Sequence, residues 1–387
     1  MARYLWLNWS GGGNLPPSLG IARALTERGH TVTFAGRPEM VPRVEAAGFP
    51  TIEFKQAYAQ VDRYPQGSPM TKAACYLTSA AVSHEARAIV AAEAPDVVII
   101  DAMFPAALVE APTFSLPTAI ACHTFVFRQL DRWRQIIARL DGMRQQAGLG
   151  SLPPLDVLWR AADRIVVTAA ASFDAAPEAG WDSVRHVGPV LEDEKVAVPT
   201  PLPWTADDPT PLVLISFSTG FEQRAPDKFQ RCLDALGGLP VHVVATTGGI
   251  VATDELKAPA NACVLNYAAH DPILQHAALA VTHGGHGTAM RALRHGVPMI
   301  VLPGLAHDQP CIAETMQEWG VGRALPGDAD VATIRTAAQE ILSNPSYRKR
   351  ALQRATALRG DDGAVVAAHE FEELAAPAPV PAYGSVR

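Results

Sequence analysis

Short apolar runs alternate with amphipathic stretches through the first half of the chain. The run Tyr4–Trp9 precedes a helical pattern over Pro16–Arg28, and a second run, DVVII, occupies Asp96–Ile100. Runs of about five apolar residues between helices predict parallel strands that are covered on both faces of a sheet. Further strands are predicted at Thr31–Ala35, Thr118–Cys122, Arg164–Thr168 and Ser183–Val187, and further helices at Glu39–Ala47, Met70–Ala92 and Phe104–Thr113.

The same alternation restarts after a proline-rich segment. Prolines at 199, 201, 203 and 209 exclude a helix or a central strand over residues 192–210 and predict a semi-rigid linker. A strand at Pro211–Phe217 and a helix at Asp227–Leu236 follow. The later elements predicted are strands at Val241–Ala245, Cys263–Asn266, Ala278–Thr282 and Pro298–Leu302, and a helix at Ala364–Leu374. The fold class is therefore α/β, with two doubly wound parallel-sheet domains facing a central cleft.

The regular order breaks between Thr124 and Leu155. A helical stretch rich in Arg, Gln and Trp covers Arg128–Ala147, and the segment GLGSLPP follows it. An irregular insertion after a parallel strand is where α/β folds usually recognise ligands. We therefore expect this insertion to contribute to a binding site.

The most specific pattern in the second half is HGGHGT, from His283 to Thr288. It follows a predicted strand and opens a helix, so backbone N–H groups and the helix dipole favour a bound diphosphate there. The next predicted strand leads to a loop that contains His307, Asp308 and Gln309. Both loops lie at the carboxyl ends of parallel strands, where open α/β sheets bind ligands.

Composition narrows the functional classes. Of the 387 residues, 48% are apolar and 18% are charged. The net charge of −7 argues against a basic surface that binds nucleic acid. No apolar stretch approaches the ~18 residues of a membrane span. Scattered single cysteines without CxxC spacing indicate reduced thiols in a cytoplasmic protein. His283 and His286 lie three residues apart, but no Cys or carboxylate accompanies them in sequence, so no metal site is expected.

HGGHGT, the following GVPMIVLP and the triplet HDQ resemble the donor-site signature of family 1 inverting glycosyltransferases of the GT-B fold. SFSTG (Ser216–Gly220) is similar to the family's phosphate-side loop, and NYAAHDPIL (Asn266–Leu274) to its base-binding segment. The resemblance covers nearly the full chain in order and spacing. It is closest to actinobacterial enzymes that glycosylate polyketides and other natural products.

This resemblance implies a division of the chain into functional parts. Two Rossmann-like domains are expected, an acceptor-binding domain over residues 1–191 and a donor-binding domain over residues 211–360. The linker 192–210 joins them, a helix in 361–376 returns to the first domain, and residues 377–387 form a tail.

The resemblance also implies a set of donor-binding residues. Ser218 and Thr219 would contact the diphosphate from one side. Tyr267 replaces the tryptophan that often stacks on the base, and the backbone of Ala268 would read the edge of the base. The diphosphate would be held from the other side by His283, Gly285, Gly287 and Thr288, and the sugar hydroxyls by Asp308 and Gln309.

The opening loop SGGGNLPP, Ser10–Pro17, contains three glycines but does not fit GxGxxG, because Pro16 stands where the last glycine should be. In the family that the chain resembles, this loop faces the acceptor and carries a His that takes the proton from the acceptor hydroxyl. Here Asn14 stands at that position. A neutral amide has no proton acceptor that titrates near pH 7, so the base lies elsewhere or the reaction needs less of one.

Three mechanisms therefore stay open. Asp101, which in the family orients the missing His, can itself deprotonate the acceptor, directly or through water. His123 can serve as the base, or it can be a His packed at a strand end. The acceptor can also be a phenol, or react through a carbon ortho to a phenolate, with Asn14 only orienting it.

The function that the resemblance implies is an inverting, metal-independent transfer of a sugar, expected to be a deoxysugar, from a dTDP or UDP donor to a small hydrophobic or aromatic natural-product acceptor. No cofactor is expected beyond the nucleotide sugar as co-substrate, and a homodimer is an open option. The alternatives are a nucleotide-sugar epimerase of GT-B architecture and a non-catalytic auxiliary partner of a glycosyltransferase. The acceptor-binding residues expected are Gly13, Asn14, Phe104, Phe125 and Trp133.

Overall fold

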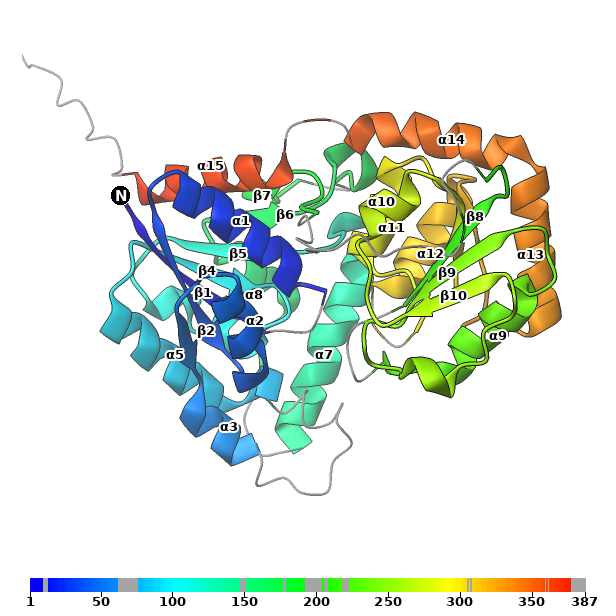
Figure 1. Ribbon diagram of the computed structural model, residues 1–387. Coiled ribbons are helices and arrows are strands. Elements are labelled where there is room, and N and C mark those ends of the chain that lie inside the picture. The colour runs from blue at the N-terminus through cyan, green and yellow to red at the C-terminus, as the bar shows by residue number, and fades with distance from the viewer. Residues whose placement is uncertain are drawn as a thin grey trace, which may run out of the picture.

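The computed structural model describes residues 1–9, 13–61, 76–146, 151–176, 179–191, 204, 208–217, 223–304, 306, 308–358, 360 and 362–376. These residues form two lobes that lie side by side, each built around one parallel sheet (Figure 1). The first lobe surrounds a seven-stranded sheet and the second a six-stranded sheet, which confirms the predicted α/β class with two parallel-sheet units.

The first sheet has the strand order β3-β2-β1-β4-β5-β6-β7, and all of its pairs are parallel. Strand order reverses beside β1, so the carboxyl ends of β1 and β4 flank a crevice of the kind that binds ligands in such sheets. The strands are β1 (Arg3–Asn8), β2 (Thr31–Gly36), β3 (Thr51–Glu53), β4 (Val97–Asp101), β5 (Thr118–Cys122), β6 (Arg164–Val167) and β7 (Val184–His186).

The second sheet has the order β10-β9-β8-β11-β12-β13 and is also parallel throughout. Here the reversal lies between β8 and β11, whose ends carry the SFSTG and HGGHGT segments. The strands are β8 (Leu212–Ser216), β9 (His242–Thr246), β10 (Ala262–Leu265), β11 (Ala277–Thr282), β12 (Met299–Val301) and β13 (Gly322–Ala324).

Helices cover both sheets, because central strands such as β4, β5 and β8 are buried along their whole length and need cover on both faces. The helices of the first lobe are α1 (Leu15–Glu27), α2 (Val41–Ala46), α3 (Lys55–Val61), α5 (Ala80–Glu93), α6 (Pro105–Leu108), α7 (Leu130–Gln146) and α8 (Leu155–Arg160). Those that follow are α9 (Pro226–Leu236), α10 (His270–Leu274), α11 (His286–Arg294), α12 (Gln309–Glu318), α13 (Val331–Ser343), α14 (Pro345–Ala355) and α15 (Gly363–Ala375).

Two predicted helices differ from the structure. The expected helix Met70–Ala92 is interrupted at Ser79, whose backbone is extended (φ −66°, ψ 134°) and whose hydroxyl accepts a hydrogen bond from the N–H of Ala81. A serine that caps a helix in this way starts α5 there, while residues 70–75 lie outside the described part of the chain. The expected helix Phe104–Thr113 is split into α6 and a 3-10 turn, Ala111–Thr113.

Helix α15 lies along α1 of the first lobe although it follows the whole second lobe in sequence (Figure 1). Phe371 is fully buried and meets the indole of Trp6 edge-on, and the hydroxyl of Tyr4 donates a hydrogen bond to the carbonyl of Phe371 (3.3 Å). Arg28 pairs with Glu372 at 2.7 Å. The side chains of α15 therefore complete the core under β1, β2 and β4.

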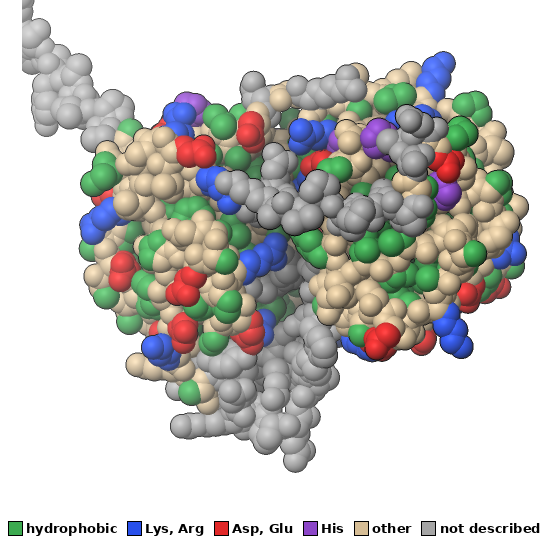
Figure 2. All heavy atoms as spheres, in the orientation of Figure 1, with side chains coloured by type: hydrophobic (Ala, Val, Ile, Leu, Met, Phe, Trp, Pro, Cys, Tyr) green, Lys and Arg blue, Asp and Glu red, His purple; other side chains and the backbone are tan. Residues whose placement is uncertain are grey.

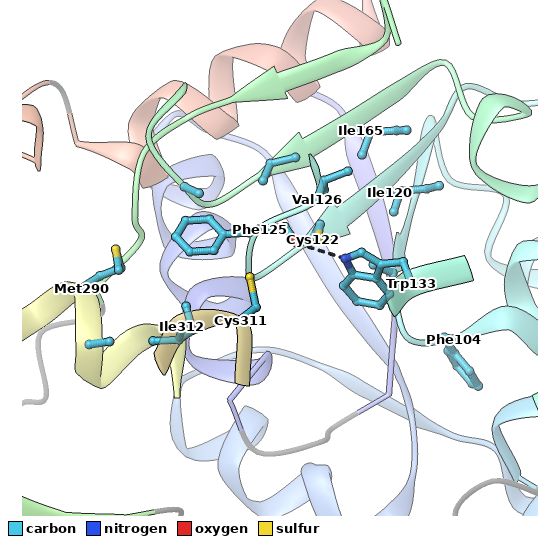
Figure 3. Packing of buried hydrophobic residues seen from close by; sticks show 14 of the residues in the cluster. Phe104, Ile120, Cys122, Phe125, Val126, Trp133, Ile165, Met290, Cys311 and Ile312 are labelled. Carbon is cyan, nitrogen blue, oxygen red and sulfur yellow. Dashed lines mark hydrogen bonds between the residues drawn. The ribbon is translucent and has the colours of Figure 1, made fainter. Parts of the chain in front are cut away.

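The two lobes share apolar packing at their contact. Figure 3 shows Phe125, which follows β5 of the first lobe, close to Met290, Cys311 and Ile312 of the second. Charged side chains of both signs are interspersed on the face of the molecule in Figure 2, unlike the clustered basic surface of a nucleic-acid-binding protein. Among the described helices none is both long and apolar enough to span a bilayer.

Candidate active site

Asn14 and Asp101 meet at the carboxyl edge of the first sheet. Asp101 is the last residue of β4, and Asn14 precedes the first turn of α1. The side-chain amide of Asn14 donates a hydrogen bond to Oδ2 of Asp101, and the backbone N–H of Met103 donates to Oδ1 (2.8 Å). Both side chains are buried, with 2% and 1% of their surface exposed. The structure thus brings together the two residues that the sequence singled out from separate segments.

Burial raises the pKa of Asp101 to about 6, although the hydrogen bonds from Asn14 and from the N–H of Met103 act in the opposite direction. A carboxyl group with this pKa can exchange a proton close to neutral pH. The Oδ1 atom of Asn14 is buried and has no hydrogen-bond partner among the described residues. An amide oxygen in this position can accept a hydrogen bond from a hydroxyl group but cannot take its proton.

His123 lies beside this pair, one strand further along the sheet. Ala121 of β5 is paired with Asp101 of β4, and His123 follows two residues later, where the chain leaves the sheet. Its side chain is half-buried. Its role as a base stays a prediction.

The aromatic residues expected to bind an acceptor are packed in the core. Phe104 is fully buried against Phe54 and Tyr76, and the indole N–H of Trp133 donates to the carbonyl of Phe125 (2.9 Å; Figure 3). The side chains of Phe104, Phe125 and Trp133 are therefore part of the hydrophobic core of the first lobe. Their direct contact with an acceptor stays a prediction. A Cβ atom on Gly13, by contrast, would meet nothing within 4 Å, so there is open space beside this residue.

The HGGHGT loop connects β11 to α11 through a tight turn that needs glycine. Gly284 has φ +87°, and a Cβ atom there would lie 2.8 Å from Val301 and 3.0 Å from the carbonyl of Gln309. Gly285 precedes the first turn of α11, and a Cβ atom on it would lie 2.7 Å from Nε2 of His283. The first N–H groups of α11 have no partners within the helix and can bind an anion at this end.

His283 lies between the end of β11 and the first glycine of this turn. Burial lowers the pKa of His283 to about 4, the charge of Lys228 lowers it further, and a hydrogen bond with the backbone of Ser216 opposes the shift. The imidazole is therefore neutral at pH 7 and offers a hydrogen bond rather than a charge. Lys228, which belongs to no recognisable sequence motif, brings a cation to this end of the sheet, where its ammonium donates to the carbonyls of Leu302 and Pro303 (both 3.2 Å).

Asp308 and Gln309 begin α12 at the end of the neighbouring loop. Burial raises the pKa of Asp308 to about 6, against the hydrogen bonds of its own N–H and that of Gln309. The side chain of Gln309 accepts from the N–H of Gly304 (2.5 Å) and donates to Gln223 (2.6 Å), so it holds the loop in this state. Contacts of both residues with a sugar stay a prediction.

The remaining residues that were predicted to bind the donor are distributed around the same edge of the second sheet. Tyr267 follows β10 with 48% of its surface exposed, whereas Ala268 is buried. Gly287 and Thr288 lie in the first turn of α11, and no atom within 4 Å would obstruct a Cβ atom on Gly287. Ser218, Thr219 and His307 lie outside the described residues.

Similarity to known proteins extends over nearly the whole chain. Residues 230–369 match the family model for the C-terminal domain of proteins like erythromycin biosynthesis protein CIII. The NDP-glycosyltransferase YjiC of Bacillus licheniformis is 25% identical over 95% of this chain and 96% of its own length. The oleandomycin glycosyltransferase of Streptomyces antibioticus is 28% identical over 95% of this chain and 89% of its own length, and the demethyllactenocin mycarosyltransferase of Streptomyces fradiae is 25% identical over 95% and 85%.

The chain is a glycosyltransferase of the GT-B fold. The calicheamicin glycosyltransferase CalG4 superposes with a TM-score of 0.76 at 24% identity over 97% of this chain and 98% of its own. The glycosyltransferase of kitacinnamycin gives a TM-score of 0.77 at 23% identity over 97% and 99%. Both structures support the GT-B arrangement of the two lobes.

Two features of this glycosyltransferase were not predicted from the sequence, because they join residues of different lobes. Nε2 of His286, at the start of α11, lies 3.0 Å from the carbonyl oxygen of Thr168 in the first lobe, and its ring meets Phe125 edge-on. Arg128 binds Thr315 (3.0 Å) and Glu318 of α12. The contacts connect helices α11 and α12 to the first lobe.

A buried carboxylate holds the segment that makes these contacts. Asp174 is fully buried and accepts hydrogen bonds from the backbone N–H groups of Val126, Phe127 and Arg128, each at 2.8 Å. His186 lies 2.9 Å from the same carboxylate. The beginning of the 124–155 insertion is thereby fixed where the two lobes meet.

Proposed function

We propose that the chain transfers a sugar, with inversion at the anomeric carbon, from a dTDP or UDP donor to a small hydrophobic natural-product aglycone. The arrangement at the start of α11 carries this proposal, since free helix N–H groups, the neutral His283 and the nearby Lys228 suit a departing diphosphate. The names of the relatives, a mycarosyltransferase and an oleandomycin glycosyltransferase, support a deoxysugar donor and a polyketide acceptor. The glycosyltransferase VinC, which has the same fold, was crystallised in complex with dTDP.

In this mechanism Asp101 is the base and Asn14 orients the acceptor. The acceptor hydroxyl donates a hydrogen bond to the unpartnered oxygen of Asn14 or to Asp101, and its proton passes to the carboxylate of Asp101, directly or through water. The freed oxygen attacks the anomeric carbon while the bond to the diphosphate breaks, and the leaving diphosphate keeps the bonding electrons. His123 as the base, and an acceptor that is already a phenolate, are the two competing routes.

Nucleotide binding tests the donor site. We expect His283→Ala to weaken binding of dTDP or UDP, whichever the wild type prefers, by ~1–3 kcal/mol, because one hydrogen bond to the diphosphate is lost. Isothermal titration calorimetry measures both nucleotides on both proteins. His84→Ala, which removes an exposed histidine of α5, is the matched control. Equal affinity in wild type and His283→Ala would refute the assigned diphosphate site.

A further inference from the structure

We propose that Arg37 is a second acceptor-binding residue, which selects acceptors that carry a carboxylate or another anionic group far from the reacting hydroxyl. This inference rests on the proposed transferase function and names the acceptor class for the same site. Arg37 follows β2 at the carboxyl edge of the first sheet, the edge that also carries Asp101. Ligands bind at this edge in open parallel sheets.

The guanidinium group of Arg37 is held by two aromatic rings. Its central carbon lies 4.6 Å from the ring centroid of Trp9 and 5.7 Å from that of Tyr76. Only 16% of the side chain is exposed. The cation is therefore fixed in position and largely desolvated, which strengthens any bond that it makes to an anion.

This cation has fewer hydrogen-bond acceptors than it can use. An arginine offers five N–H donors, and among the described residues Arg37 donates one side-chain hydrogen bond, from Nη2 to Glu39 at 3.1 Å. Its Nε is buried and has no acceptor in the described part of the chain. A buried polar group of this kind costs free energy unless a partner completes it, and a carboxylate fits the planar donor set of arginine.

The pairing of the strands gives the approximate distance between Arg37 and Asp101, where the acceptor hydroxyl would react. Gly36 of β2 pairs with Asn8 of β1, and Leu7 of β1 pairs with Ile100 of β4, so β1 separates Arg37 from Asp101. Two strand spacings amount to about 10 Å. An acceptor with a hydroxyl at Asp101 and a carboxylate at Arg37 is therefore an elongated molecule, such as two fused aromatic rings with these groups at opposite ends.

A purely structural role makes a different prediction. If Arg37 serves only to stack on Trp9 and to pair with Glu39, its loss changes stability but not the choice between a charged and a neutral acceptor. A matched acid and ester separate the two roles, because they differ in charge and share the same ring system and hydroxyl.

The experiment compares 6-hydroxy-2-naphthoate with its methyl ester on the full chain. Binding is measured by calorimetry, and transfer from the preferred nucleotide sugar by mass spectrometry. We expect the wild type to bind the acid about tenfold or more tightly than the ester, and Arg37→Gln to lose this preference with little change for the ester. Arg37→Lys should keep part of the preference, and Glu39→Gln should increase it, because a competing carboxylate is removed. Arg43→Gln, an exposed arginine of α2, is the control and should behave as the wild type.

Equal affinity of the wild type for acid and ester, or the same preference in Arg37→Gln, would overturn the subsite. Its failure and that of the proposed function are distinguishable. If acid binding depends on Arg37 but no sugar reaches any hydroxyl, the subsite stands and the transferase mechanism fails. If both compounds are glycosylated equally by wild type and Arg37→Gln, the transferase stands and the subsite fails.

Discussion

Asp101 is the member of the Asn14–Asp101 pair that can carry a proton. Because burial raises its pKa to about 6, the carboxyl is protonated below this pH and ionised above it. If the carboxylate takes the proton of the acceptor, kcat for an aliphatic alcohol should rise with pH through about 6 and then level off. Asp101→Asn should lower kcat by ~100-fold or more and remove this rise. A pH–rate profile from pH 5 to 8 measures both effects.

Asp308 supplies the control for this profile, since burial raises its pKa to about 6 as well. Asp308→Asn should reduce turnover but keep the inflection. Asn14→His should restore the pairing of the resembled family and keep or increase kcat with weakly acidic hydroxyls. An inflection that disappears in Asp308→Asn and persists in Asp101→Asn would assign the titration to the donor side instead.

Single residues were predictable where a local motif fixes their surroundings. The HGGHGT segment could be assigned to a strand–turn–helix junction, because Gly284 needs a positive φ and the helix begins two residues later. Asn14 and Asp101 could be paired only through the family resemblance. The role of Arg37 could not be predicted, since its partners Trp9 and Tyr76 come from distant segments and arginine alone has no specific sequence signature.

At the scale of elements, strand positions followed from the sequence and several ends of helices did not. A buried parallel strand is a continuous apolar run, so β4 and β5 were predicted within one residue at each end. The short strands β3 and β13 were missed, because three residues carry too little pattern. The break at Ser79 depends on a capping hydrogen bond that competes with an otherwise helical sequence.

Helix α15 provides a test of stability at this scale. Phe371→Ala should lower the free energy of unfolding by ~3–5 kcal/mol, because a fully buried ring is removed from its contact with Trp6. Urea unfolding followed by tryptophan fluorescence measures this loss. Val365→Ala, on the exposed side of the same helix, should change stability by less than about 1 kcal/mol. A similar small effect in both variants would mean that α15 is only loosely attached.

On the scale of the whole molecule, ion pairs connect the two lobes. Arg132 binds Glu314 at 2.7 Å, and Arg128 binds Glu318 and Thr315, so the segment that leads into α7 and the first turns of α7 lie against α12. Salt screens such partly exposed pairs, since the Debye length falls from about 10 Å at ~0.1 M to about 3 Å at ~1 M. We expect sugar transfer to depend on this contact between the lobes.

We therefore expect Arg128→Ala to lower kcat about 2- to 5-fold while nucleotide affinity stays within error, because the residues predicted to bind the donor all lie in the second lobe. High salt should lower kcat of the wild type to a similar degree and affect the variant less. Arg134→Ala, in the neighbouring helix α7, is the control, since Arg134 pairs with Asp131 and Asp156 inside the first lobe. A salt response that is identical in wild type and Arg128→Ala would remove these pairs from any role in lobe contact.

The return of α15 to the first lobe has a consequence for biosynthesis. Ala364, Ala367 and Phe371 share one core with Trp6 and Phe34, yet the ribosome makes them after every strand of the second sheet. Domains commonly fold in the order in which they are translated. Here the lobe that is made first stays incomplete until the lobe made second has left the ribosome, so the nascent chain exposes an apolar surface around α1 for most of its synthesis. Chaperones of the trigger-factor type should therefore bind a nascent chain that is stalled before residue 363.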